Sequence, residues 1–214
     1  MPLSRTGATK PDQIMELGGL AGMLGPSLLG GSILVLTVIE YEFLRSLGWH
    51  PISAVRTDWP SGLALGPQGW LMIGAFIGSG GLLCLLAAGL RRGLGGLGAG
   101  LLGIAGLALA GLAFKTDPTY GGAPRTLAGG IHDSAFATLA VSLLGSMLTL
   151  SWETRRRAGW GGYSRYCLAS AGSALICFAI SGVFYYLFLA ISLAWVAATG
   201  AQLRGLAQRR SASD

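Results

Sequence analysis

Long apolar runs separated by short polar segments are the main pattern of this sequence. A helix needs about 20 mostly apolar residues to cross the hydrocarbon layer of a membrane. Six runs come close to or exceed this length, at about 17–39, 68–90, 96–114, 131–151, 165–182 and 184–203. Only Ser181, Gly182 and Val183 separate the last two runs, so these two helices are expected to form a tight hairpin.

The pattern therefore predicts an all-α protein, an integral membrane bundle of six transmembrane helices with both termini on one side. The bundle would form a single domain over 17–203, between an N-terminal tail at 1–16 and a basic C-terminal tail at 204–214. The longest connection lies between the first two spans, at 40–67, and is expected to contain a short helix on the membrane surface.

The composition supports a membrane location and excludes an ordinary soluble domain. Hydrophobic residues make up 52% of the chain and charged residues only 11%, whereas soluble domains carry about 25% charged residues. The 36 glycines suit a membrane bundle, because small residues spaced by four let helices approach closely. The expected close contacts are at Gly18-x3-Gly22, Gly74-x3-Gly78 and Gly96-x3-Gly100.

The basic residues indicate how the bundle lies across the membrane. Lys and Arg are enriched on the cytoplasmic side. Eleven of the 15 basic residues fall on the side of the two termini, and the other four are Arg45, Arg56, Lys115 and Arg125. Both tails are therefore expected to be cytoplasmic. The net charge of +6 follows from this topology, so the expected partner is the lipid bilayer and not a nucleic acid.

Polar residues of functional interest collect at the predicted outer side, where the span 96–114 ends and the span 131–151 begins. The central part of each span lacks charged residues, which argues against transport coupled to an ion at the midplane. The candidate catalytic residues are His132, Asp117 and Asp133. The candidate ligand-binding residues are the same three with Thr116, Thr126, His50, Asp58 and Glu40.

Three interpretations of these residues are open. A carboxylate could hold His132 in one tautomer, so that the imidazole acts as a general base. Histidine and carboxylates could also bind a divalent metal, although two histidines make a zinc hydrolase a poor match and no cofactor is predicted. The third interpretation is structural, with Asp117 in a turn, Thr126 as a helix cap and Asp133 in the first helical turn.

Parts of the sequence resemble a prokaryotic six-helix membrane family known as domain of unknown function 998. The main match is Phe114-Lys-Thr-Asp-Pro118, followed by Thr126, Gly130 and His132-Asp133. The segments His50-Pro-Ile-Ser-Ala-Val-Arg56 and Gly66-Pro-Gln-Gly-Trp70 are similar to its first loop and to the start of its second helix. The chain departs from the family pattern at Val55-Arg-Thr-Asp-Trp59 and at Tyr185-Tyr186.

This resemblance covers about 17–203 and implies six helices in a prokaryotic plasma membrane, with the polar residues of interest on the outer face. It implies no activity. The sequence favours a non-enzymatic protein that binds a small ligand, a lipid headgroup or a membrane protein partner at the outer face. The alternative is a membrane-embedded hydrolase or transferase that uses His132 with Asp117 or Asp133, and a small transporter is disfavoured.

Overall fold

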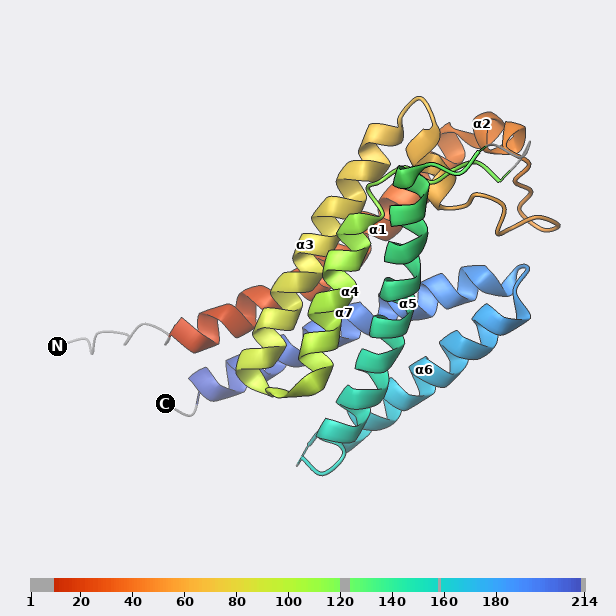
Figure 1. Ribbon diagram of the computed structural model, residues 1–214. Coiled ribbons are helices and arrows are strands. Elements are labelled where there is room, and N and C mark those ends of the chain that lie inside the picture. The colour runs from red at the N-terminus through yellow and green to blue at the C-terminus, as the bar shows by residue number, and fades with distance from the viewer. Residues whose placement is uncertain (1–9, 120–123, 158, 213–214) are drawn as a thin grey trace.

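The computed structural model describes residues 10–119, 124–157 and 159–212, with side chains from residue 13 onward. Most of these residues are helical (Figure 1). The elements in chain order are α1 (Lys10–Ile39), α2 (Tyr41–Ser46), the 3-10 helix η1 (Ser61–Leu65), α3 (Gly69–Gly93), α4 (Gly96–Gly111), α5 (Leu127–Thr154), α6 (Gly161–Ile180) and α7 (Phe184–Ser211).

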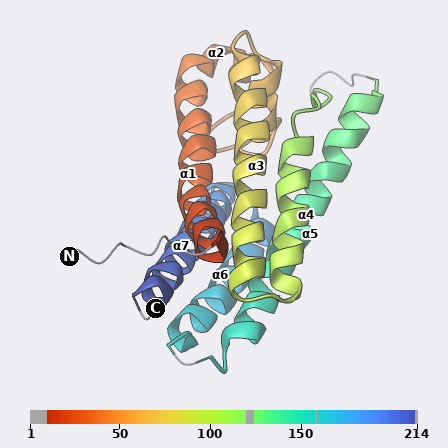
Figure 2. The ribbon, with the colours of Figure 1, turned by 90° about the vertical axis from the view of Figure 1, so that its left-hand side faces the viewer.

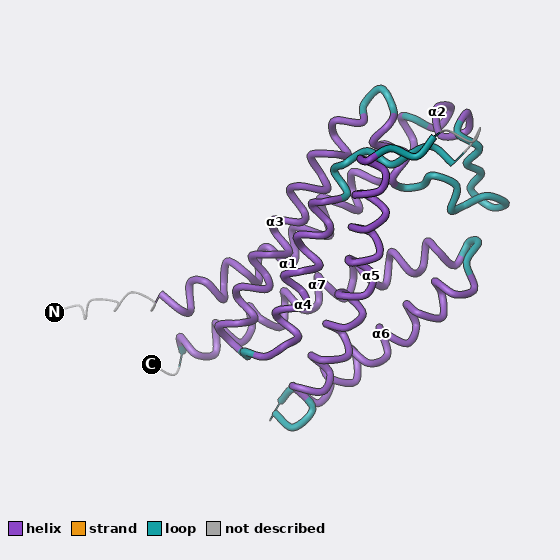
Figure 3. Tube along the Cα trace, viewed as in Figure 1, coloured by secondary structure: helices purple, strands orange, loops and turns teal. Residues whose placement is uncertain are grey.

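The six longer helices form a closed ring in chain order. Helix α1 packs against α3, α3 against α4, α4 against α5, α5 against α6, α6 against α7, and α7 returns to α1. Figure 2 shows α1, α3, α4 and α5 as a row, with α6 and the start of α7 behind it and the C-terminal end of α7 below α1. Figures 1 and 3 show α5 and α6 diverging from their connecting turn. Antiparallel neighbours follow from connections that are mostly short.

The loops gather at one end of this ring (Figure 3). We call it the loop end, because it carries the connections 40–68 and 112–126. The opposite end, which carries the start of α1 and the last turns of α7, is called the termini end. Helices α6 and α7 meet in a tight hairpin near the loop end, where Ser181 and Gly182 have positive φ angles of 64° and 56°. The predicted turn at 181–183 is confirmed.

Among the described residues, five helices are long and apolar enough to cross a membrane, namely Gln13–Ile39 within α1, and α3, α5, α6 and α7. The all-α prediction is confirmed, but several helix bounds differ from the expected ones. Helix α1 begins at Lys10 and α5 at Leu127, so both extend further toward the N-terminus than the apolar runs. Helix α7 continues to Ser211, through most of the segment expected to be a tail.

Helix α4 ends at Gly111 and is shorter than the expected span 96–114. Its last turn tightens, since Ala113 N–H donates to the Ala110 carbonyl and Phe114 N–H to the Gly111 carbonyl, each three residues back. Such bonds are common where a helix ends. The apolar run continues past this point, but the backbone leaves the helical path.

Glycine contacts draw the helices together at the termini end. A Cβ atom on Gly200 of α7 would lie 2.6 Å from the Gly19 carbonyl oxygen and 2.9 Å from the Gly22 Cα. On the other face of α1, a Cβ on Gly18 would lie 3.0 Å from the Gly89 Cα of α3. The first predicted glycine motif is thus confirmed as a packing face.

The other two predicted glycine motifs behave differently. A Cβ on Gly74 or on Gly100 would meet no atom within 4 Å, so neither position requires glycine for a neighbouring helix. The close contact between α3 and α4 uses Gly80 and Gly106 instead, where an added Cβ would lie 2.6 Å and 2.8 Å from the partner glycine's carbonyl oxygen.

The 40–68 loop covers the loop end with aromatic contacts. Trp59 stacks on Trp49 and packs edge-on against Tyr186 of α7, and its indole N–H donates to Thr37 of α1 at 2.9 Å. The Arg56 guanidinium lies 4.7 Å from the Phe178 ring centre of α6. The loop contains two short helices, α2 and η1, where one short helix was expected.

Candidate functional site

His132 connects three elements at the loop end. It lies in the second turn of α5 and is 3% exposed. Its Nδ1 atom is 2.8 Å from the Phe114 carbonyl oxygen and 3.1 Å from that of Leu112, at the end of α4. A carbonyl oxygen only accepts hydrogen bonds, so Nδ1 carries a proton. The Nε2 atom lies 3.0 Å from the Ser61 Oγ at the start of η1.

Thr126 and Asp117 form a second connection, beside the start of α5. The Thr126 hydroxyl caps the helix by accepting from Gly129 N–H at 3.0 Å. It donates to Asp117 Oδ1 at 2.6 Å, and Thr126 N–H donates to Oδ2 at 2.7 Å. A side chain on Gly129 would collide with this carboxylate. The hydrogen bond from the Thr126 hydroxyl, followed by that from its N–H, lowers the pKa of Asp117 from its ordinary 3.8.

Two buried carboxylates fix the loops in the same way. Asp58 accepts hydrogen bonds from the backbone N–H and the hydroxyl of Thr119, the latter at 2.9 Å. Glu40, the residue between α1 and α2, accepts from the N–H of Gln68. Gly66 leaves room for the Glu40 carboxylate, because a Cβ there would overlap it. Glu40 therefore holds the backbone segment before α3, and Asp58 holds the segment after α4.

The remaining predicted residues lie further from these contacts. His50 is half-buried and pairs through its backbone with Ala54, and Thr116 has a hydroxyl 3.5 Å from the Asp117 carbonyl oxygen. Asp133 is exposed. Because α5 begins at Leu127, Asp133 falls in its second turn, and the expectation that it lies in the first turn is wrong.

The structure thus separates residues that the sequence grouped. The partners of the His132 ring are two carbonyl oxygens and a serine hydroxyl, while Asp117 pairs with Thr126. No group of three His, Cys, Asp or Glu side chains that could hold a metal ion occurs among the described residues. The expected meeting of the helix ends is confirmed, because His132 contacts Phe114 and Asp117 contacts Thr126. Ligand binding by these residues stays a prediction.

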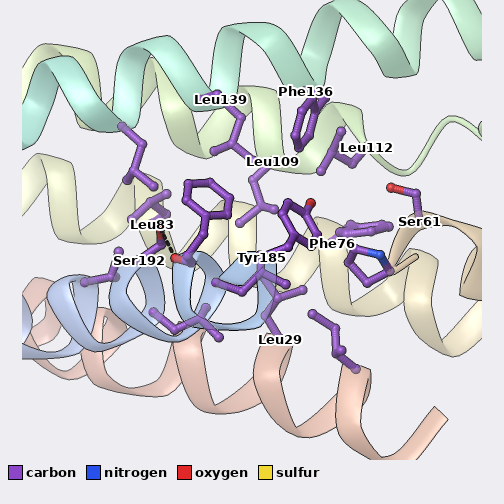
Figure 4. Close-up of a pocket in the computed structure, with 18 residues that line it drawn as sticks. Leu29, Ser61, Phe76, Leu83, Leu109, Leu112, Phe136, Leu139, Tyr185 and Ser192 are labelled. Atoms are coloured by element: carbon purple, nitrogen blue, oxygen red, sulfur yellow. Dashed lines mark hydrogen bonds between the residues drawn. The ribbon is translucent and has the colours of Figure 1, made fainter. Parts of the chain in front are cut away.

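An apolar cavity of about 110 Å³ lies inside the ring beneath Ser61. Figure 4 shows Ser61 at one end of it and Ser192 of α7 toward the other, with aliphatic and aromatic side chains between them. The labelled aliphatic and aromatic side chains come from five helices and the turn that ends α4: Leu29, Phe76, Leu83, Leu109, Leu112, Phe136, Leu139 and Tyr185.

Sequence reasoning missed both the cavity and Ser61. Ser61 follows Trp59-Pro60 in a long loop, and no spacing relates it to His132, which lies 71 residues later. The lining residues are apolar positions within apolar helices, so the pattern does not distinguish them from residues that face lipid. Only the folding of η1 over the ring brings the serine, the histidine and the cavity together.

Comparison with known proteins gives one match. The family model described as "Protein of unknown function (DUF998)" matches residues 28–213. The match includes the segments on which the predicted resemblance rests, from His50 to Asp133. No curated protein and no solved structure matches the chain.

Proposed function

As the chain belongs to the DUF998 family of membrane proteins, we propose from its geometry that it binds a membrane lipid through one acyl chain. The chain would enter the cavity inside the ring, and the polar part of the lipid would remain at the loop end. The observation that carries this proposal is the apolar cavity with Ser61 at its end.

The chemistry of the lining favours a hydrocarbon ligand. Leu, Phe, Ile and Val side chains make up most of the lining, and its polar side chains among the described residues are Ser61, Ser192 and Tyr185. The Ser192 hydroxyl already donates to the Phe188 carbonyl of its own helix at 2.8 Å. A cavity of about 110 Å³ is similar in size to the ~150 Å³ apolar cavity that stays dry and binds benzene. It therefore suits a segment of an acyl chain.

The loop end offers groups for a polar headgroup. Lys115 and Arg125 are exposed on either side of the Asp117–Thr126 connection. Their charges favour an anionic group such as a lipid phosphate. Thr116, Asp117 and Asp133 lie in the same region, and with His50, Asp58 and Glu40 they keep their predicted role as ligand-binding candidates. Asp58 and Glu40 would act indirectly, because they are buried and hold the loops.

We propose six crossings of the membrane, with both termini in the cytoplasm of a prokaryotic cell. Helix α4 has 16 residues and spans about 24 Å at 1.5 Å per residue, less than a full bilayer. It nevertheless joins the termini end to the loop end, because it follows α3 by a tight turn and finishes beside His132 and Ser61. The excess of basic residues at the termini end supports a cytoplasmic location for that end.

Fusions truncated after residue 94 and after residue 119 test this topology. A reporter active only in the cytoplasm should work at position 94 and fail at 119, and it should work again at the C-terminus, residue 214. If the reporter places residues 94 and 119 on the same side of the membrane, α4 does not cross it. A periplasmic signal at 214 would overturn the six-span topology.

A photo-crosslinkable phospholipid tests the lipid proposal. With a diazirine at the end of one acyl chain, crosslinks in bilayer nanodiscs should map to cavity residues such as Leu139 and Leu193. Ala140→Phe places a ring in the cavity and should reduce these crosslinks at least fivefold. Ala137→Phe is the matched control, because Ala137 lies on the same helix, is exposed and does not line the cavity.

The two variants separate specific binding from general contact with the bilayer. Equal crosslinking in both variants would show that the label reacts only with the outer surface of the bundle. Crosslinks confined to lipid-facing residues such as Leu107, which is 70% exposed, would also contradict the proposal. The melting temperature of each variant is measured in parallel, so that loss of crosslinking is not confused with unfolding.

A further inference from the structure

We propose that Ser61 and His132 are a nucleophile and a general base that cleave the ester bond of a bound lipid. This inference rests on the proposed lipid binding and adds a reaction to it. It differs from the acid–base pairing expected from the sequence, because the partner of His132 is a serine hydroxyl and not a carboxylate.

The hydrogen bonds of His132 fix the tautomer that this reaction needs. With the proton held on Nδ1 by the carbonyl oxygens of Leu112 and Phe114, Nε2 has a free electron pair directed at Ser61. A serine hydroxyl becomes a useful nucleophile when a neighbouring base accepts its proton. In serine hydrolases a carboxylate orients the imidazole through Nδ1. Here two backbone carbonyls at the end of α4 occupy that position.

Ser61 differs from several other hydroxyl residues that contact the cavity or lie along α5. Ser134, Thr138 and Ser192 donate to the carbonyl four residues earlier in their own helices. That arrangement satisfies a hydroxyl in an apolar helix. Ser61 is instead the first residue of η1. Its hydroxyl lies within hydrogen-bond distance of the imidazole Nε2 of His132 in α5. It is also only half-buried, so a substrate can reach it.

The position of Ser61 matches the position of an ester in a lipid. An acyl chain in the cavity would direct its carbonyl carbon toward the end where Ser61 lies (Figure 4). The alcohol part of the ester would point out of the ring, toward the exposed Lys115 and Arg125. The substrate class is therefore an acyl ester of a polar alcohol, such as a glycerolipid.

The reaction has two balanced steps. Ser61 Oγ attacks the ester carbonyl carbon while its proton passes to His132 Nε2, and collapse of the intermediate breaks the bond to the alcohol oxygen. That oxygen takes the proton from Nε2 and leaves, so the acyl group remains on Ser61 as an ester. Water, or a second alcohol, then attacks this ester, with Nε2 accepting its proton and returning it to Ser61. The products are the alcohol and a carboxylic acid or a new ester.

An alkyl fluorophosphonate tests this inference, since it phosphonylates activated serines and carries an apolar chain. The full chain in nanodiscs is treated with the probe, and the adduct is located by peptide mass spectrometry. We expect the adduct on Ser61, its loss in Ser61→Ala and at least a tenfold slower reaction in His132→Gln. Ser134→Ala is the matched control and should react at the normal rate, because Ser134 does not line the cavity and its hydroxyl donates to the Gly130 carbonyl of its own helix at 2.9 Å.

The outcomes distinguish the two proposals. No adduct on Ser61 in protein that still crosslinks the lipid probe inside the cavity would overturn catalysis and leave lipid binding intact. Loss of both signals in folded protein would overturn both. An adduct that forms equally fast in His132→Gln would show that His132 does not activate Ser61. If a variant fails to fold, the location of the adduct in the natural sequence still tests whether Ser61 is the nucleophile.

Discussion

The two ends of this bundle are held together in different ways. At the termini end, α1 and α7 meet through Gly19, Gly22 and Gly200, so that backbone lies against backbone. At the loop end the same two helices carry large side chains such as Ile33 and Phe188, which line a cavity. Polar contacts from His132, Asp58 and Glu40 then connect the loops across this end.

The two kinds of contact give the two ends of the bundle different rigidity. A glycine contact leaves no space and little freedom, because each backbone fills the groove of the other. Helices separated by large side chains leave irregular spaces, and loops joined by a few hydrogen bonds can move at lower cost. A site that admits a lipid is therefore expected at the loop end, and a rigid framework at the termini end.

The largest expected effect comes from the glycine contact. Gly200→Leu would press a side chain against the backbone of α1 at Gly19 and Gly22. Overpacking of this kind costs about 1–3 kcal/mol and sometimes more. We expect the upper end of this range or beyond, because backbone atoms cannot swing aside. Thermal unfolding in detergent measures the change.

Gly74→Leu is the control for the glycine prediction. Gly74 is exposed and a Cβ there meets no atom within 4 Å, so stability should stay the same or rise by up to about 1 kcal/mol through the better helix propensity of leucine. If both variants unfold at the same temperature, the termini end is not limited by backbone contact and the contrast between the two ends fails.

An intermediate effect is expected at His132. His132→Ala removes the bonds to Leu112, Phe114 and Ser61 and leaves buried carbonyl oxygens without that donor. An unsatisfied buried polar group costs about 1–3 kcal/mol. Asp133→Ala changes the next, exposed residue of α5 and should alter stability by less than about 0.5 kcal/mol. Equal unfolding midpoints for the two variants would contradict the connecting role of His132.

The smallest effect is expected at Asp117, as a dependence on pH. The hydrogen bonds from Thr126 lower its pKa below 3.8 in the folded protein. The stabilisation is therefore complete above about pH 4 and is lost as the pH falls through the lowered pKa. Below pH 4, the melting temperature should fall more steeply with decreasing pH in the natural sequence than in Asp117→Asn. Parallel acid profiles for the two proteins would show that the carboxylate does not stabilise the connection.

Hydropathy predicted the helices well because burial in lipid constrains every residue of a span. It predicted their ends less well. The bonds that end α4 at Gly111 and the Thr126 cap that begins α5 depend on local backbone contacts, and neither coincides with a change from apolar to polar residues. The glycine motifs show the same limit, since Gly18-x3-Gly22 meets neighbouring helices while Gly74 does not.

The candidate site was predicted in part. The sequence located His132, Asp117 and Thr126 where two helices approach, because one short connection joins those helices. It could not assign their partners, which are set by which side of α5 each residue occupies. His132 faces the ring and meets Ser61 from the 40–68 loop, whereas its neighbour Asp133 is exposed.

By itself, the sequence determined that this is an all-helical, multi-pass membrane protein of the DUF998 family, because long apolar runs and a few clustered motifs are properties of adjacent residues. The tertiary structure alone decided that the helices close into a ring, that the ring encloses a cavity and that η1 brings Ser61 to His132. These features depend on contacts between residues far apart in the chain, which arise only when side-chain volumes and backbone hydrogen bonds are satisfied together in three dimensions.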